Sequence, residues 1–329
     1  MKFFDLHCDT LSRLIDIKKQ NPLMSEDLFS NSGHIDIKRL LDNKTKDMQN
    51  IQVFAIFCGE DPEKSVEYMN LQIEYFFDQV KKYSSYIMQC RNRDDIIKAL
   101  KANKIPAVLS VEGMNFPHSE SLLKKFKDIG VKILGFSWNY SGNFCESCEV
   151  GTMRQGPSSL EENSGVDSGL TGIGEQAVKF CNDHGMMIDV SHSSDKTIQD
   201  ILNISSMPIV ATHSNSYAIH RHKRNLTDDL AKKIAEKGGI IGINFYPEFL
   251  SDKNISDVND IIKHINHFGF LLGSSHIAIG SDFDGIRKVP RGIEDCSKYD
   301  DFVKYLKNET DNDKLNSILS KNFMNLLRS

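Results

Sequence analysis

Eight short, strand-forming runs recur along this chain and restrict its fold more than any other feature. Most are apolar almost throughout, without alternation of polar and apolar residues. That pattern is typical of strands buried on both faces of a parallel sheet. The runs occupy residues 2–7, 51–57, 105–111, 131–137, 186–191, 207–212, 239–245 and 276–281.

Segments with a helical period lie between most of these runs. They predict helices at residues 65–83, 92–104, 119–130, 171–185, 193–205, 226–239 and 257–273, and a wholly helical C-terminal part at 298–327. Ser119 and Thr171 suit the N-cap position, and Gly130 and Gly185 suit the residue that follows a helix.

Strands that alternate with helices in a chain of 329 residues predict a TIM-like (β/α)8 barrel, of α/β class. A doubly wound open sheet is the competing fold, but no G-x-G-x-x-G follows the first strand. Residues 1–329 contain no evident linker or internal repeat, so we expect one domain. The Gly-, Ser- and Asn-rich segment 138–170 predicts a long loop over the active site.

Composition excludes several classes of function. Charged residues make up 26% of the chain and the net charge is -5, which argues against a nucleic-acid partner. No stretch approaches the roughly 18 apolar residues of a spanning helix, and no signal peptide is evident. We therefore expect a soluble cytoplasmic protein without a membrane partner.

The seven cysteines predict reduced thiols and not a disulfide framework, because they are odd in number and scattered. Cys145 and Cys148 form the one C-x-x-C pair. We interpret them as ordinary loop cysteines, with a redox or zinc pair as the alternative.

Histidines or carboxylates stand at or just beyond the ends of five of the predicted strands. They are His7, Asp9, Glu112, His192, His213 and Asp282. In a barrel, the residues that follow the C-terminal strand ends meet at one mouth. Each residue alone has an ordinary interpretation as a loop, turn or surface residue. Together at one mouth, however, the carboxylates would repel one another and the imidazoles would lack hydrogen-bond partners. A divalent cation bound among them removes both problems.

The residue types narrow the identity of the metal. Imidazoles and carboxylates without thiolates suit Zn²⁺, and also Mn²⁺, Fe²⁺ or Co²⁺. Six candidate ligands are more than one tetrahedral zinc ion can bind, and they suit two ions about 3.5–4 Å apart. The sequence therefore predicts a centre with two metal ions.

The spacing of the candidates suggests how two ions divide them. His7 and Asp9 are two residues apart on an extended strand, so one ion can take both. Cys8 lies between them and faces the helix layer. His192 and His213 come from neighbouring strands and can hold the second ion, and Glu112, with two oxygens, is the natural bridge.

The chain resembles the membrane (renal) dipeptidase family of zinc peptidases, peptidase family M19, including its soluble bacterial members. The resemblance runs nearly end to end. It is most specific in DLHCDT, SVEGM, IDVSHSS, ATHSNSYAIHRHKRNLTDD, INFYPEFL and IGSDFDGIRKVPRGIEDCSKY. It implies a barrel of the metal-dependent hydrolase type with two Zn²⁺ ions per chain, and a homodimer.

The resemblance implies the same division of metal ligands. His7 and Asp9 match the ligands of one zinc, His192 and His213 those of the other, and Glu112 the bridging carboxylate.

The resemblance also assigns residues to catalysis and substrate binding. Asp282 matches the acid/base aspartate beside a water or hydroxide that bridges the metals and attacks the peptide bond of a dipeptide. Arg224 matches the arginine that binds the C-terminal carboxylate of the substrate. Several family members have a histidine after the fourth strand, where this chain has Trp138. Asn139, His220 or His222 are candidates to replace its contact with the scissile carbonyl, and the alternative is that the metals alone suffice there.

Two other functions stay open from the sequence. One is another metal-dependent amidohydrolase acting on N-acyl amino acids or lactams, and the other is a non-catalytic, metal-binding relative. The preferred dipeptide, including tolerance of a D-residue at its C-terminal side, is not fixed by the sequence.

Overall fold

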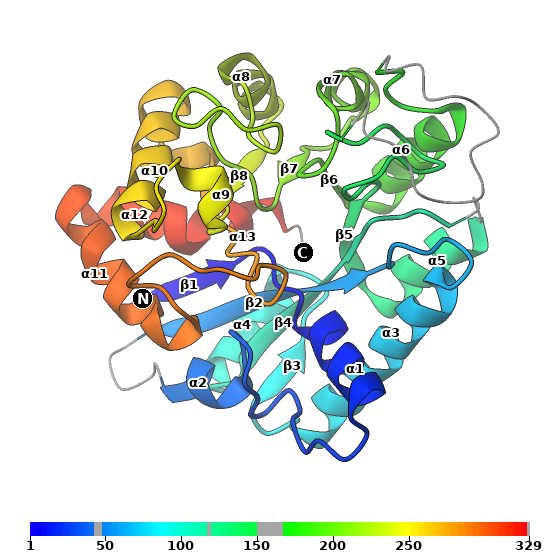
Figure 1. Ribbon diagram of the computed structural model, residues 1–329, viewed down its shortest axis with the longest axis vertical. Helices are drawn as coiled ribbons and strands as arrows, with labels where there is room; N and C mark the ends of the chain where they lie inside the picture. The colour runs from blue at the N-terminus through cyan, green and yellow to red at the C-terminus, as the bar shows by residue number, and fades with distance from the viewer. Residues whose placement is uncertain (43–47, 117–119, 150–166, 328–329) are drawn as a thin grey trace.

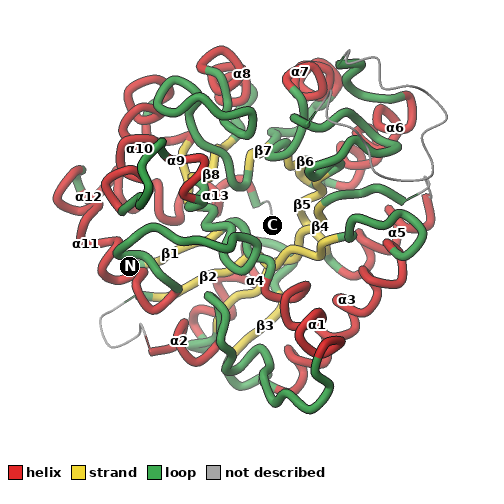
Figure 2. Tube along the Cα trace, in the orientation of Figure 1, coloured by secondary structure: helices red, strands yellow, loops and turns green. Residues whose placement is uncertain are grey.

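The computed structural model describes residues 1–42, 48–116, 120–149 and 167–327, and within them nine parallel strands form one sheet. The strands are β1 (Lys2–Asp5), β2 (Gln49–Phe57), β3 (Ile87–Gln89), β4 (Ile105–Glu112), β5 (Val131–Gly135), β6 (Met187–Asp189), β7 (Val210–Ala211), β8 (Ile240–Ile243) and β9 (Ile277–Ile279). Strand β1 pairs with β9, and β2 pairs with both β1 and β4. Eight strands therefore close into a barrel, as predicted, with the helices outside it (Figures 1 and 2).

The ninth strand, β3, was not predicted. It pairs only with the start of β4, where Ile87 lies opposite Ile105, and does not take part in barrel closure. Three residues with a polar end, Ile-Met-Gln, give too short a pattern to recognise. Strands β6 and β7 are also shorter than predicted. Beyond their ends, the carboxylate of Asp189 accepts the backbone N–H groups of Ser191 and Thr212, so side-chain bonds replace the strand ladder.

The helices surround the barrel in the described part of the chain (Figure 2). They are α1 (Thr10–Gln20), α2 (Ile37–Asp42), α3 (Ser65–Lys82), α4 (Arg93–Lys101), α5 (Glu120–Ile129), α6 (Gly172–His184), α7 (Asp195–Ile204), α8 (Asp228–Glu236), α9 (Pro247–Leu250), α10 (Val258–Leu272), α11 (Tyr299–Glu309), α12 (Asn312–Asn316) and α13 (Asn322–Leu326). The seven internal helices that the sequence predicted are present, while α1, α2 and α9 were not predicted. None of the described helices is long and apolar enough to cross a membrane.

The predicted helix boundaries agree in part with the structure. The Thr171 side chain accepts the N–H of Gly174, and Gly185 adopts a φ of 63°, as expected for a cap and a left-handed helix end. The predicted cap Ser119 lies outside the described residues. The C-terminal part is not wholly helical, because Thr310 and Asp311 are extended and separate α11 from α12. The predicted loop 138–170 is irregular at 138–149 and 167–170, and its remainder lies outside the described residues.

An apolar cluster fills the barrel, and every barrel strand contributes to it. Its members on or directly after the barrel strands are Phe4, Leu6, Ile51, Val53, Val108, Ile133, Met187, Val210, Ile240 and Ala278. Phe323 of α13 packs edge-on against Phe4, with ring centroids 4.9 Å apart, so the C-terminal helix covers the N-terminal end of the barrel. The interior is thus a packed core, and only the opposite mouth can hold a site.

Candidate metal centre

The candidate ligands gather at the C-terminal mouth of the barrel, each on or just after a strand. His7 and Asp9 follow β1, Glu112 ends β4, and His192, His213 and Asp282 follow β6, β7 and β9. All are buried except Asp282, which is partly buried. Barrel closure therefore brings together the six residues that the sequence placed at strand ends.

Glu112 lies at the middle of the cluster, and its two oxygens face different groups. Its Oε1 lies 3.0 Å from His192 Nε2 and 3.4 Å from His213 Nε2. Its Oε2 lies 3.6 Å from His7 Nε2, which is itself 3.2 Å from Asp9 Oδ2. The carboxylate thus lies between two donor groups and presents one oxygen to each.

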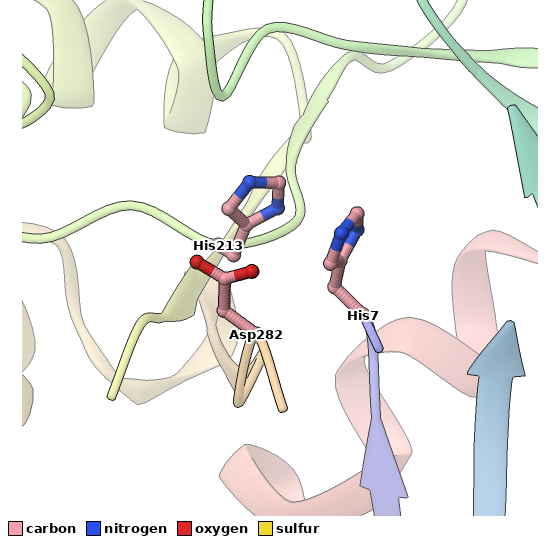
Figure 3. A group of neighbouring side chains, drawn as sticks. All are labelled: His7, His213 and Asp282. Carbon is pink, nitrogen blue, oxygen red and sulfur yellow. The ribbon is translucent and has the colours of Figure 1, made fainter. Parts of the chain in front are cut away.

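Three sets of side chains are each close enough to hold one ion. In each set the donor atoms lie within 4.8 Å of one another. The sets are His7–Asp9–Glu112, Glu112–His192–His213 and His7–His213–Asp282. Figure 3 shows the third set, in which His7 and His213 stand side by side above the Asp282 carboxylate. The first two sets share only Glu112, so they match the two metal positions expected from the sequence.

The electrostatics of the cluster fit a cation. Burial raises the pKa of Glu112 well above its ordinary value, and the carboxylates of Asp9 and Asp282 raise it further. Burial lowers the pKa of His192 and His213, with Arg224 and His7 adding to the effect, so both imidazoles are neutral, the form that binds metals. Burial also opposes the charged form of His7, yet the negative charges of Glu112 and Asp9 outweigh it and raise its pKa to about 10. The surroundings of His7 therefore favour a positive charge.

The atoms left without partners also fit a metal. Within the described residues, Glu112 Oε1 is buried with no hydrogen-bond donor, although two imidazole nitrogens face it. Those nitrogens, Nε2 of His192 and of His213, lie 3.0 Å apart and point at each other. Lone pairs that converge in this way suit a cation with nitrogen and oxygen ligands, and zinc is the usual choice for such a set.

Arg224 approaches the same cluster from the loop after β7. Its side chain is buried, and its Nη2 lies 3.1 Å from His192 Nε2. Its Nε and Nη1 have no partner among the described residues, and its guanidinium lies over the ring of Phe249 at 5.3 Å. A buried guanidinium with unpaired N–H groups favours an anionic ligand.

Asn244 is a site residue that the sequence analysis missed. It follows β8, and its side-chain amide donates to Asp282 Oδ2 at 2.8 Å. Burial and Asp9 raise the pKa of Asp282 to about 6, while His7 and Asn244 act in the other direction. The sequence analysis missed Asn244 because it lies within the predicted run 239–245, whereas strand β8 ends at Ile243, one residue before it.

Trp138 and Asn139 lie on the outer side of His192. The Trp138 ring is 4.9 Å from that of Phe57 and 6.1 Å from that of His192, between centroids. Asn139 is exposed, and its Oδ1 lies 3.2 Å from His192 Nδ1. The residue next to the position of the family histidine therefore contacts an expected metal ligand, while a substrate contact of Asn139 stays a prediction.

The cysteines take no part in the cluster. All seven are free, and Cys8 is buried in the helix layer, where its thiol donates to the carbonyl of Val53. Cys145 is buried and Cys148 is partly buried, and no disulfide joins them. The interpretation of the C-x-x-C pair as ordinary loop cysteines agrees with this arrangement.

Comparison with known sequences identifies the family. Residues 1–329 match the family described as Membrane dipeptidase (Peptidase family M19). The chain belongs to this family. It is accordingly a hydrolase of the metallo-dipeptidase type, as the resemblance of its motifs implied.

Two curated relatives carry dipeptidase names. An uncharacterized dipeptidase of Schizosaccharomyces pombe is 29% identical over 92% of this chain and 73% of its own length. Dipeptidase aclJ of Aspergillus oryzae is 28% identical over 83% of this chain and 64% of its own length.

Solved structures share the fold over almost the whole chain. The dipeptidase AC, a metallopeptidase of family M19, has a TM-score of 0.84 and 24% identity, covering 99% of this chain and 98% of its own. A metallopeptidase of Rhodobacter sphaeroides, solved with a phosphinate mimic of the dipeptide L-Ala-D-Ala, has the same TM-score and coverage and 23% identity.

Proposed function

We propose that this protein is a dipeptidase with two zinc ions, which hydrolyses the peptide bond of dipeptides, including those with a D-residue at the C-terminal side. The observation that carries this proposal is the position of Glu112, whose two oxygens face two separate donor sets. Two ions held there would activate the attacking water and polarise the scissile carbonyl.

The protein residues would hold the substrate and move its protons. Asp282 would accept a proton from the attacking water and return it to the leaving amine, and the hydrogen bond from Asn244 to its Oδ2 supports this role. Arg224 would bind the free C-terminal carboxylate, because a planar guanidinium matches a carboxylate better than an ammonium does. A substrate held between Arg224 and the metal cluster would be limited in length, which favours dipeptides over longer peptides.

The acceptance of a D-residue draws support from a relative. The Rhodobacter sphaeroides metallopeptidase binds a mimic of L-Ala-D-Ala and shares the fold of this chain. An arginine that holds only the terminal carboxylate does not by itself select the configuration of the side chain beside it.

A substrate screen tests the proposal. The purified chain, loaded in parallel with Zn²⁺, Mn²⁺ or Co²⁺, is assayed on L,L and L,D dipeptides, N-acyl amino acids and lactams, and its metal content is measured. We expect two ions per chain and the highest kcat/KM on dipeptides with both termini free. Faster turnover of acyl amino acids or lactams would favour the amidohydrolase alternative, and a chain that binds metal but hydrolyses none of these substrates would favour the non-catalytic one.

We also propose that residues 1–329 form one domain. Phe3 of β1 stacks on Tyr299 of α11 at 4.1 Å between centroids, and Phe4 packs on Phe323 of α13, so the first strand and the last helices share a core. A homodimer and a cytoplasmic location stay predictions, and light scattering on the purified chain tests the first.

A further inference from the structure

The carboxylate of Asp189, at the end of β6, accepts hydrogen bonds from the two residues that precede expected metal ligands. Ser191 donates its backbone N–H at 3.0 Å and its hydroxyl at 2.6 Å to Oδ1. Thr212 donates its backbone N–H to Oδ1 at 3.0 Å and its hydroxyl to Oδ2. Asp189 is buried and therefore ties the end of β6 to the end of β7 beneath His192 and His213.

These bonds decide which nitrogen of His213 carries the proton. Thr212 has one hydroxyl hydrogen, and Asp189 takes it, because an ionised carboxylate can only accept. The Thr212 oxygen, 2.8 Å from His213 Nδ1, must then accept a hydrogen from that nitrogen. The Nε2 atom is left with a bare lone pair, and Nε2 is the atom that faces Glu112 and His192.

The backbone of the same turn is held from two sides. The N–H of His213 donates to the Ser191 hydroxyl at 3.1 Å. On the other side, Gly242 and Gly280 approach the Thr212 carbonyl so closely that a Cβ would lie 2.0 Å and 1.7 Å from its oxygen. The backbone position from which the His213 imidazole extends is therefore fixed, in addition to its tautomer.

His192 has much weaker support. Its Nδ1 faces the side chain of the exposed Asn139 at 3.2 Å, and no buried carboxylate stands behind that amide in the described residues. Of the two imidazoles, His213 alone is joined through a hydroxyl to a buried carboxylate among the residues that the structure describes.

We propose that Asp189 is a positioning residue that acts through Thr212: it selects the Nδ1-protonated tautomer of His213 and thereby sets the metal affinity of the position formed by Glu112, His192 and His213. This inference rests on the proposed function, because it concerns the second of the two ions. An outer hydrogen bond of this kind typically changes metal affinity by about 10–100-fold.

The first test compares two substitutions of Thr212. Thr212→Val keeps the size of the side chain but removes the hydroxyl, whereas Thr212→Ser keeps the hydroxyl. Zinc affinity is measured for both ions of the full chain by competition with a chelator. We expect Thr212→Val to bind one ion about 10–100-fold more weakly and the other unchanged, and Thr212→Ser to resemble the wild-type chain.

The second test reads the tautomer directly. In Asp189→Asn, the oxygen of the new amide stays with the three donors at the Oδ1 position, so its NH₂ group faces Thr212. The Thr212 hydroxyl is then free to donate to His213 Nδ1, and the proton moves to Nε2. Nitrogen chemical shifts of ¹⁵N-labelled histidines in the metal-free chain distinguish the two forms, and we expect them to invert for His213 alone.

The outcomes separate this inference from the proposed function. A wild-type chain that binds fewer than two ions overturns the proposed function. A wild-type chain that binds two, together with a Thr212→Val chain that keeps both at unchanged affinity, overturns only the role of Asp189. An Asp189→Asn chain in which His213 keeps its tautomer does the same, even if Thr212→Val fails to fold.

Discussion

The two halves of the candidate metal centre are built in different ways. His7 and Asp9 come from a single strand end, two residues apart, with their interacting atoms 3.2 Å from each other. His192 and His213 come from two strands and are 21 residues apart in the chain. The first half pairs an imidazole with a carboxylate, whereas the second has two neutral imidazoles, with Arg224 against His192 and Thr212 against His213.

If the centre holds the two proposed ions, this difference gives them unequal support. The first half contains the carboxylate of Asp9, so it can attract a cation without help from neighbouring strands. The second half takes its charge from Glu112 and its geometry from hydrogen bonds between strands. Perturbations of strand packing should therefore affect the second ion more than the first.

Glu112→Gln should have the largest effect, because Glu112 is the residue that both halves share in the described part of the chain. An amide removes the bridging charge, and we expect loss of both ions and a fall in kcat/KM beyond about 100-fold, the upper end for a merely supporting group. Metal analysis and dipeptide kinetics measure this. A variant that keeps two ions and near-wild-type turnover would contradict the role of Glu112 as a ligand shared by both ions.

Arg224→Ala should damage substrate binding and spare the metals. Losing a charge-assisted contact costs about 1.5–3 kcal/mol, so kcat/KM on a free dipeptide should fall about 10–150-fold, mainly through KM. An amidated dipeptide is the matched control, because it has no carboxylate to lose. An equal fall in kcat/KM on the free and the amidated dipeptide would show that Arg224 acts by supporting His192.

Two glycine substitutions separate the halves. In Gly285→Ala the new Cβ would lie 2.3 Å from Asp9 Oδ2, a side-chain atom, and in Gly280→Ala it would lie 1.7 Å from a backbone oxygen of Thr212. A side chain can move aside more easily than backbone. We expect Gly280→Ala to lose about 1–3 kcal/mol of unfolding free energy. Gly285→Ala should lose less and should weaken the ion at His7 and Asp9.

Chemical denaturation of the metal-free variants and chelator competition measure these effects. The comparison between halves fails if Gly285→Ala weakens the ion at His192 and His213 instead.

Asn139→Ala should have the smallest effect. The amide is exposed and makes a neutral hydrogen bond to His192, a contact worth about 0.5–1.5 kcal/mol. We expect a two- to tenfold weaker second ion or lower kcat/KM, clearly less than for Thr212→Val. A larger loss of kcat with both ions retained would instead indicate that Asn139 contacts the reacting substrate.

Local patterns predicted most of the fold. Continuous apolar runs identified the barrel strands, and Thr171 and Gly185 marked helix ends correctly, because caps and buried strands depend on neighbouring residues. Strand β3 escaped recognition because three residues form a strand only when β4 offers them an edge. The break between α11 and α12 at Thr310 and Asp311 was not predicted, because residues typical of helices continue on both sides of it.

The sequence by itself determined the ligand types, the strand ends that carry them and the family to which the chain belongs. Only the tertiary structure decided how these residues meet, that Asn244 holds Asp282, and that Asp189 orients His213 through Thr212. The physical reason is that residue identity fixes which atoms can donate, accept or bind a metal. Distances of about 3 Å between residues far apart in the chain arise only when the barrel closes.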